Sequence, residues 1–152
     1  AVPLPSAPVI SASRAQELAQ ALEKLPVSVE ETTAGMALRI ADDRQFAPGS
    51  IHPDPQLRAL LPRIAAALDR QAGAIVVVGH ADATPAGARY ASNAELSAAR
   101  ARAAARLMAS KLQDPKRLSV EGRGDAEPVA PNDDEAGRAK NRRVAILLKA
   151  AP

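Results

Sequence analysis

The chain has 152 residues, enough for one domain with a hydrophobic core and a short appendage. With one Phe, one Tyr and no Trp, its core must be aliphatic, and binding of sugars or bases by ring stacking is disfavoured. The lack of cysteine excludes disulfides and thiolate chemistry, and a formal net charge of +3, from 20 basic and 17 acidic residues, is compatible with an anionic partner.

The N-terminal region predicts a linker followed by a helix. Residues 1–12 (AVPLPSAPVISA) are rich in Pro, Ala and Ser, as is typical of a flexible linker. Ser13 and Gln16 match a helix-capping pattern, and Pro26 ends the helix, which gives a helical segment at residues 13–26. Its apolar stripe is Leu18, Leu22 and Leu25. The chain has neither a basic signal-peptide start nor about 18 consecutive apolar residues, so we expect any membrane anchor to lie outside it.

A β-hairpin and a second helix are predicted next. Apolar residues alternate in residues 27–29 and again in residues 36–40, and Gly35 supplies the turn. After a loop, a helix is expected near Asp54, with Pro55 at its first position. Pro62 lies inside this pattern and predicts a kink or a later start. The apolar stripe of the helix is Leu57, Leu60, Leu61, Ile64 and Leu68.

The second half of the chain alternates strands and helices. Residues 75–78 (IVVV) predict a strand that is buried on both faces. Ser92 and Glu95 form a capping pattern that opens a helix running to about Leu112. Further expectations are a strand at residues 118–120, a short helix after Asn132, and a last strand with Val144, Ile146 and Leu148 on one face. The order β-α-β-α-β-(α)-β predicts an α/β sandwich, with helices on one mixed sheet of about four strands and an additional N-terminal helix.

One charged residue falls on the apolar face of the helix that begins after Ser92. At 100° per residue, Arg100 shares a stripe with Leu96, Ala103 and Leu107, whereas Arg102 and Arg106 point elsewhere. A guanidinium on an apolar face requires a carboxylate or an anionic ligand, because an unpaired buried charge is costly. Arg100 is therefore the first candidate for a functional residue.

Asp82 is the candidate partner, since it follows the apolar strand at the sheet edge where open α/β sheets tend to hold ligands. Two interpretations remain open. Asp82 and Arg100 form a structural salt bridge, or they form a clamp for a zwitterion, in which Asp82 holds an ammonium group and Arg100 holds a carboxylate through a bidentate fork.

Four segments resemble those of a known family, the OmpA-like domains. Residues 79–82 (GHAD) resemble the family motif G-H-T-D, residues 92–101 (SNAELSAARA) resemble S-N-x-x-L-S-x-x-R-A, and residues 137–144 (GRAKNRRV) resemble G-R-A-x-N-R-R-V. Residues 46–50 (FAPGS) resemble the F-x-x-G-S loop. The resemblance implies an OmpA-like domain at residues 27–149, followed by a tail at residues 150–152.

The resemblance also implies a function, which is non-catalytic binding of peptidoglycan through its diaminopimelate. In the family, the Asp and Arg at the positions of Asp82 and Arg100 contact the amine and the carboxylate of that residue. No cofactor is implied. The implied site also includes Asn93, Arg142, Phe46, Ala47, Ala81 and Leu96. Two residues depart from the family pattern, since Ala81 replaces a threonine and Ala47 occupies a position that is often acidic, so weaker binding is expected.

The wider resemblance implies a location and a set of partners. Residues 130–133 (APND) and the spacing from Asp82 to Ser92 are similar to MotB-like stator proteins of the flagellar motor and to TssL-type proteins of type VI secretion. Residues 121–125 (EGRGD) favour the type VI group. Both groups imply the periplasm of a Gram-negative cell, an inner-membrane anchor outside this chain, and other envelope components as partners. A homodimer through the helix at residues 13–26 is a further expectation.

Other classes of function have weaker support. His80 and Asp82 form an H-x-D pair, but His52 is the only other histidine, and a metal site usually has three or four ligands. No G-x-S-x-G motif of a serine hydrolase is present. Basic residues on one helix suggest nucleic acid as an alternative partner, but no RNA-binding signature accompanies them. The more serious alternative is an OmpA-like domain that has lost peptidoglycan binding and serves protein–protein contact in the envelope.

Overall fold

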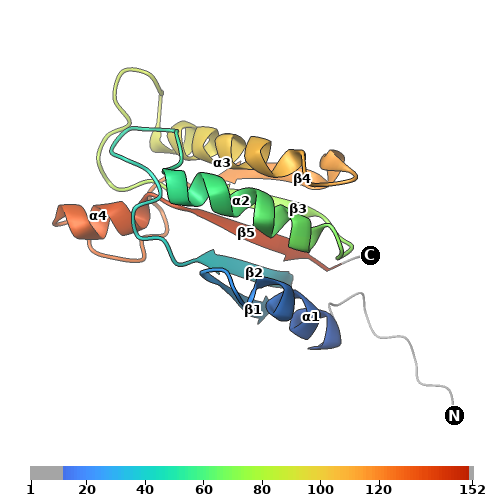
Figure 1. Ribbon diagram of the computed structural model, residues 1–152. Coiled ribbons are helices and arrows are strands. Elements are labelled where there is room, and N and C mark those ends of the chain that lie inside the picture. Colours follow the sequence, from blue (N-terminus) through green and yellow to red (C-terminus); the bar gives the residue numbers. More distant parts are fainter. Residues whose placement is uncertain (1–11, 151–152) are drawn as a thin grey trace, which may run out of the picture.

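A mixed five-stranded sheet with the order β1-β2-β5-β3-β4 organises residues 12–150, the part of the chain that the computed structural model describes (Figure 1). The strands are β1 (Val27–Thr32), β2 (Gly35–Ile40), β3 (Ile75–Gly79), β4 (Leu118–Gly122) and β5 (Val144–Lys149). The helices are α1 (Ala12–Leu22), α2 (Pro55–Leu68), α3 (Asn93–Ala109), the short 3₁₀ helix η1 (Pro115–Arg117) and α4 (Glu135–Asn141). The predicted fold class is confirmed.

The sheet is one strand larger than predicted, because both arms of the hairpin belong to it. β1 pairs only with β2 and forms one edge, while β2 continues into the sheet through its antiparallel pairing with β5. β3 lies between the parallel β4 and the antiparallel β5. All five of its residues are buried, as the run of apolar residues predicted.

The strand directions bring the predicted site residues to one end of the sheet. β2, β3 and β4 end there, and β5 begins there, because β5 is antiparallel to both β2 and β3. The β2–α2 loop, the β3–α3 loop and α4 gather at this end (Figure 1). Segments that are about 60 residues apart in sequence, such as Asp82 and Arg142, therefore become neighbours.

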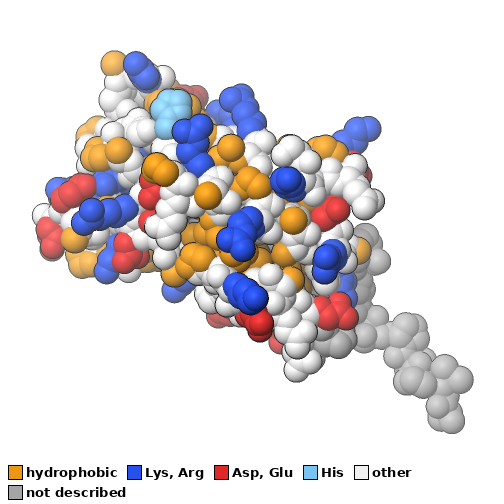
Figure 2. All heavy atoms as spheres, viewed as in Figure 1, with side chains coloured by type: hydrophobic (Ala, Val, Ile, Leu, Met, Phe, Trp, Pro, Cys, Tyr) orange, Lys and Arg blue, Asp and Glu red, His pale blue; other side chains and the backbone are white. Residues whose placement is uncertain are grey.

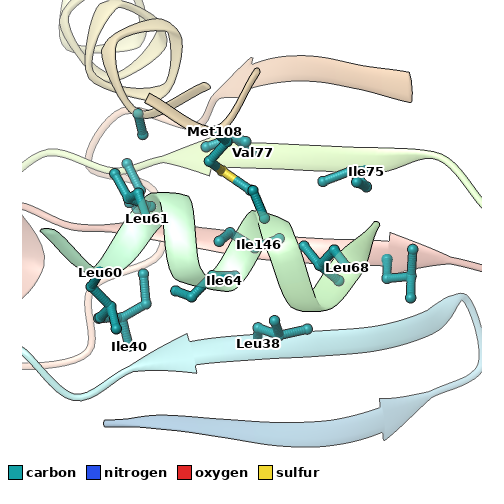
Figure 3. Packing of buried hydrophobic residues seen from close by; sticks show 14 of the residues in the cluster. Leu38, Ile40, Leu60, Leu61, Ile64, Leu68, Ile75, Val77, Met108 and Ile146 are labelled. Carbon is teal, nitrogen blue, oxygen red and sulfur yellow. The ribbon is translucent and has the colours of Figure 1, made fainter. Parts of the chain in front are cut away.

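The core lies between the sheet and α2, with α3 beside α2. Asp54 caps α2 by accepting a hydrogen bond from the Leu57 amide at 2.8 Å, so the helix begins where predicted and Pro62 does not delay it. Figure 3 shows Leu61, Ile64 and Leu68 of this helix directed at the side chains of β2, β3 and β5. All five residues of the predicted α2 stripe are buried.

Two helices differ from their predicted bounds. α1 ends at Leu22, four residues before Pro26, although Leu18 and Leu22 are buried as expected. Its leucines pack in the core of the same chain, so this apolar face is already occupied. The side chain of Ser13, with its predicted cap, and residues 1–11 of the predicted linker lie outside the described part of the structure.

The second difference concerns α3, which ends at Ala109 and not near Leu112. Ser92 caps it as predicted, accepting from the Glu95 amide at 3.1 Å. The predicted stripe was only half correct, because Leu96 and Arg100 are buried whereas Ala103 and Leu107 are only half-buried. The fully buried residues of its second half are Ala101, Ala104 and Met108.

Gly79 allows α3 to approach the end of β3 closely. A Cβ atom at this position would lie 1.9 Å from the backbone oxygen of Ser97. Ser97 is itself buried, and its hydroxyl donates to Ala94 O and accepts from the Gly124 amide at 2.8 Å. The glycine thus fixes the distance between the helix that carries Arg100 and the strand end that carries Asp82.

We predict that Gly79→Ala lowers the free energy of unfolding by about 1–3 kcal/mol, because the added methyl group must displace α3 from the sheet. Urea unfolding followed by circular dichroism measures this change. The matched control is Ser119→Ala, at an exposed position of the neighbouring strand, for which we expect a change within about 0.5 kcal/mol. Equal stability of the two variants would contradict the close approach.

Candidate functional site

Arg100 is buried at the end of the sheet, with an exposed fraction of 1%. Its guanidinium donates to three backbone carbonyls, those of Ser50 at 2.8 Å, His80 at 3.3 Å and Ala47 at 3.5 Å. Within residues 12–150, no carboxylate forms an ion pair with it. Its positive charge is thus solvated by the protein backbone but not neutralised by direct contact.

The Phe46 ring and the burial of the site also affect the Arg100 guanidinium. Its Cζ atom lies 5.2 Å from the centroid of the Phe46 ring, within the range of a cation–π interaction. Burial lowers the pKa of Arg100 to about 10, with Asp82 acting in the opposite direction and Arg142 adding to the decrease. The side chain therefore remains charged at neutral pH, and Asp82 lies close enough to stabilise that charge.

Asp82 is paired with Arg142. Its Oδ2 atom accepts from Arg142 Nη1 at 2.7 Å, and its Oδ1 atom accepts from the Thr84 amide at 2.9 Å. Both side chains of the ion pair are almost completely buried. Of the two interpretations that the sequence left open, the direct salt bridge between Asp82 and Arg100 is not found, because this carboxylate pairs with the guanidinium that precedes β5 and not with the one on α3.

Glu135 is the functional candidate that sequence reasoning missed. Arg142 Nη2 donates to Glu135 Oε2 at 2.6 Å, and Nη1 also donates to Oε1 at 3.3 Å, so the pair forms a fork. Burial disfavours the charge of Arg142, but hydrogen bonds to Glu135 and Asp82 outweigh it and raise the pKa. The only sequence signal was the spacing of seven residues, about two helical turns, which brings Arg142, the residue that follows α4, near the side of the helix that carries Glu135.

The Arg142 guanidinium also reaches the β2–α2 loop. Its Nε atom donates to the carbonyl of Phe46 at 2.8 Å. The Phe46 side chain is buried, whereas Ala47 is exposed and contributes only its carbonyl to Arg100. Phe46 therefore borders Arg142 through its carbonyl and Arg100 through its ring, whereas Ala47 borders Arg100 through its carbonyl.

The other predicted site residues surround Asp82 and Arg100. Asn93 Nδ2 donates to the Asp82 carbonyl at 3.5 Å, and its Oδ1 atom is buried without a partner among the described residues. Ala81 is buried, and its amide donates to Gly124 O at 2.8 Å. Leu96 is buried one helical turn before Arg100.

Residues 137–144 (GRAKNRRV) hold the loop that covers one side of the site. The Asn141 side chain accepts from the amides of Val129 and Ala130 and donates to Ala130 O, so it substitutes for a strand partner. Gly137 allows α4 to approach this loop, since a Cβ atom there would lie 1.9 Å from Pro131 O. Much of this motif is therefore structural, and Arg142 is its contribution to the site.

A cleft of about 550 Å³ lies next to the buried ion pair of Asp82 and Arg142, and Arg142 forms part of its lining. Phe46, Ala47 and Pro48 line one side, Ala136 and Ala139 of α4 line the other, and Arg142 and Glu135 also face it. Acidic and basic side chains lie next to one another at the α4 end of the molecule (Figure 2). The cleft therefore has a mainly apolar lining that also includes the ion pair of Glu135 and Arg142.

Comparison with known proteins identifies the family. The OmpA family model matches residues 45–142. The chain belongs to the OmpA family. Outer membrane protein A of Bordetella avium is 38% identical over 97 residues, which are 62% of this chain and 47% of that protein. The chain spans about half the length of the curated relatives it matches.

Solved structures of two kinds of protein resemble this chain. The cell wall anchor of the type VI secretion system of Pseudomonas aeruginosa has a TM-score of 0.72 and 39% identity, and covers 95% of this chain and 99% of its own. The periplasmic domain of Helicobacter pylori MotB also has a TM-score of 0.72, with 28% identity, covering 83% of this chain and 80% of its own. The predicted resemblance to these two groups is confirmed.

His80 is buried directly after β3, and its backbone forms hydrogen bonds with two neighbouring segments. Its amide donates to Arg143 O at 2.8 Å and its carbonyl accepts from Arg100, while its Nδ1 atom is buried without a partner in the described residues. Burial, with a contribution from Arg143, lowers the pKa of His80 to about 4. The imidazole is therefore neutral at physiological pH.

The described residues give no support to the metal and nucleic-acid alternatives. No group of three or more His, Asp or Glu side chains that suits a metal ion occurs within residues 12–150. Arg102, Arg106 and Lys111 are not buried, and on the face in Figure 2 Lys and Arg side chains are separated by apolar and neutral atoms. No helix in the same range is long and apolar enough to cross a bilayer.

We predict that Arg142→Met lowers the free energy of unfolding by about 3–5 kcal/mol, because it leaves the buried Asp82 carboxylate without its cation. Equilibrium urea unfolding measures the loss. Arg138→Met is the matched control, since Arg138 contacts the same Glu135 at 3.5 Å but is partly exposed, and we expect a loss of about 1 kcal/mol or less. Similar losses in both variants would contradict the proposed importance of the buried pair.

The lowered pKa of His80 predicts a pH dependence of stability. The unfolded chain takes up a proton below about pH 6.5, whereas the folded chain resists it until about pH 4, so stability falls as pH decreases between these values. Urea unfolding at several pH values should show that His80→Gln removes about 1–2 kcal/mol of this decrease. An unchanged pH dependence in the folded His80→Gln variant would assign the titration elsewhere.

Proposed function

We propose that this chain is a non-catalytic peptidoglycan-binding domain that holds the zwitterionic end of diaminopimelate. The observation that carries the proposal is the state of Arg100, which is buried and charged yet has only carbonyl oxygens in direct contact. Two of these three hydrogen bonds are 3.3 Å or longer, so the guanidinium retains capacity for a stronger acceptor. A ligand carboxylate is such an acceptor.

Asp82 supplies the opposite charge for the ligand ammonium group. A carboxylate offers about four acceptor positions, and the described contacts with Arg142 and the Thr84 amide use one on each oxygen. Asn93 adds a buried Oδ1 atom without a partner among the described residues, close to the Asp82 carbonyl. Together these oxygens suit an ammonium group beside the carboxylate that Arg100 binds, which is the arrangement at the end of an amino acid.

The adjoining cleft supports a peptide-bearing ligand. Its volume of about 550 Å³ exceeds what one amino-acid end requires, and its lining by Phe46, Pro48 and alanines suits small apolar groups. Stem peptides of the cell wall carry such groups next to diaminopimelate. Ala47 and Ala81 provide no side-chain polar group, so we expect modest affinity.

We further propose that the domain anchors an inner-membrane machine to the cell wall, in the periplasm of a Gram-negative cell. The higher identity and coverage of the type VI secretion anchor, at the same TM-score as MotB, favour type VI secretion over the flagellar stator. A membrane anchor would then lie outside this chain. A homodimer would have to use a surface other than the buried leucine face of α1.

The test is co-sedimentation of the purified domain with isolated sacculi. We predict that the wild type sediments with diaminopimelate-type sacculi but not with lysine-type sacculi, and that Arg100→Met reduces the bound fraction at least about tenfold, as for loss of a buried charged contact. Asp82→Asn should have a similar effect. Arg102→Met, an exposed arginine on the same helix, is the matched control and should bind like the wild type.

Thermal unfolding of each variant separates loss of binding from loss of fold. A folded Arg100→Met domain that still sediments would reject the clamp. A folded wild type that binds neither kind of sacculus would favour the alternative function, an OmpA-family domain that contacts other envelope proteins.

A further inference from the structure

Glu135 occupies the outer side of the buried Arg142. The guanidinium has three directions of hydrogen bonding, and each is taken by a different segment: Nε by Phe46 O, Nη1 mainly by Asp82, and Nη2 by Glu135. The side chain of Arg142 is 3% exposed, whereas that of Glu135 is 55% exposed. Glu135 is therefore the part of this network that solvent and a ligand can reach.

The buried part of the network and Glu135 hold four charges that balance one another, while Arg138, which also contacts Glu135 at 3.5 Å, is partly exposed to solvent. Arg100 and Arg142 contribute two positive charges, and Asp82 and Glu135 contribute two negative charges. A zwitterion enters such a site without adding net charge, whereas a ligand with carboxylates and no ammonium group leaves it with excess negative charge. Loss of the Glu135 charge makes the site more positive, because Arg100 and Arg142 are then opposed by Asp82 alone.

The geometry adds a second effect. Arg142 is fixed by Phe46 O and Asp82, so neutralising Glu135, as in Glu135→Gln, would leave its Nη2 atom in place with only a neutral and weaker acceptor. Nη2 would then face the cleft as a second site for a ligand carboxylate. With Glu135 present, both terminal nitrogens of Arg142 contact carboxylates. Of the two arginines, only Arg100 then lacks a carboxylate contact among the described residues.

We propose that Glu135 determines ligand selectivity: by occupying Arg142, it makes the site accept one carboxylate together with an ammonium group and discriminate against dicarboxylates that lack the ammonium group. This inference rests on the proposed function, since it concerns the same site. It assigns a role to a residue on α4 that touches neither Arg100 nor Asp82 in the described contacts. Glu135 acts by preventing Arg142 from binding a second ligand carboxylate. Exclusion of a competing ligand is a common basis of specificity.

The test compares two ligands with the same seven-carbon dicarboxylic chain, meso-diaminopimelate and pimelate, which differ by the two amino groups. Chemical-shift titration of the labelled domain measures both dissociation constants. We expect the wild type to prefer diaminopimelate, and Glu135→Gln to reduce the ratio of the two constants by roughly fivefold, the upper range for a partly exposed charge pair. The gain in pimelate affinity should shrink at high salt, because the affected group is exposed.

Two variants separate this role from a structural one. Glu127→Gln is the matched control, because Glu127 is similarly exposed and paired with Arg123 at 2.7 Å, and it should keep the wild-type ratio. Glu135→Asp keeps the charge and should retain a ratio closer to the wild type than Glu135→Gln does. A ratio in folded Glu135→Gln within twofold of the wild type would overturn the inference alone. Failure of the folded wild type to bind either ligand, in solution or on sacculi, would reject the proposed function as well.

Discussion

The guanidinium of Arg142 connects three segments that are far apart in sequence. It contacts the β2–α2 loop through Phe46 O, the β3–α3 loop through Asp82, and the first turn of α4 through Glu135. A buried arginine can serve this purpose because it presents five donors in a rigid plane. Arg142 thereby helps to fix the relative positions of these loops around Asp82. The site is therefore organised by a buried ion pair whose carboxylate, Asp82, is also a proposed ligand contact.

Much of the fold was predictable because its signals are local. The apolar run at residues 75–78, the caps at Asp54 and Ser92, and the alternation in β5 each specify an element without reference to distant residues. The number of strands in the sheet was less accessible, since the membership of β1 depends on pairing and not on composition. The buried face of α3 was misjudged for a related reason. Alanine is abundant on every side of this helix, so a few leucines had to define its orientation, and Met108 rather than Leu107 faces the core.

The candidate site was likewise predictable in part. Arg100 was predicted from helical spacing, and Asp82 from its place at a strand end, and both lie where expected. The pairing of Asp82 was not predictable, because the choice between two arginines depends on side-chain geometry across 60 residues of sequence. Glu135 was hidden for a different reason. An acidic residue in the first turn of a helix already has a sufficient local explanation in the helix dipole, so its contact with Arg142 needed the folded position of α4.

The energetics of the two arginines point to different roles. Arg142 is stabilised by two carboxylates, which raise its pKa despite burial, and such a network maintains structure. Arg100 has no carboxylate in direct contact among the described residues, and burial lowers its pKa to about 10 although Asp82 acts in the opposite direction. For structure alone, an apolar side chain on this face of α3 would avoid the desolvation cost of the charge, and replacement of buried charges by apolar residues is often neutral or stabilising. The cost has a physical explanation if the charge is there to attract an anion, because a guanidinium that is already desolvated, with long carbonyl contacts at both of its terminal nitrogens, binds a carboxylate with little reorganisation.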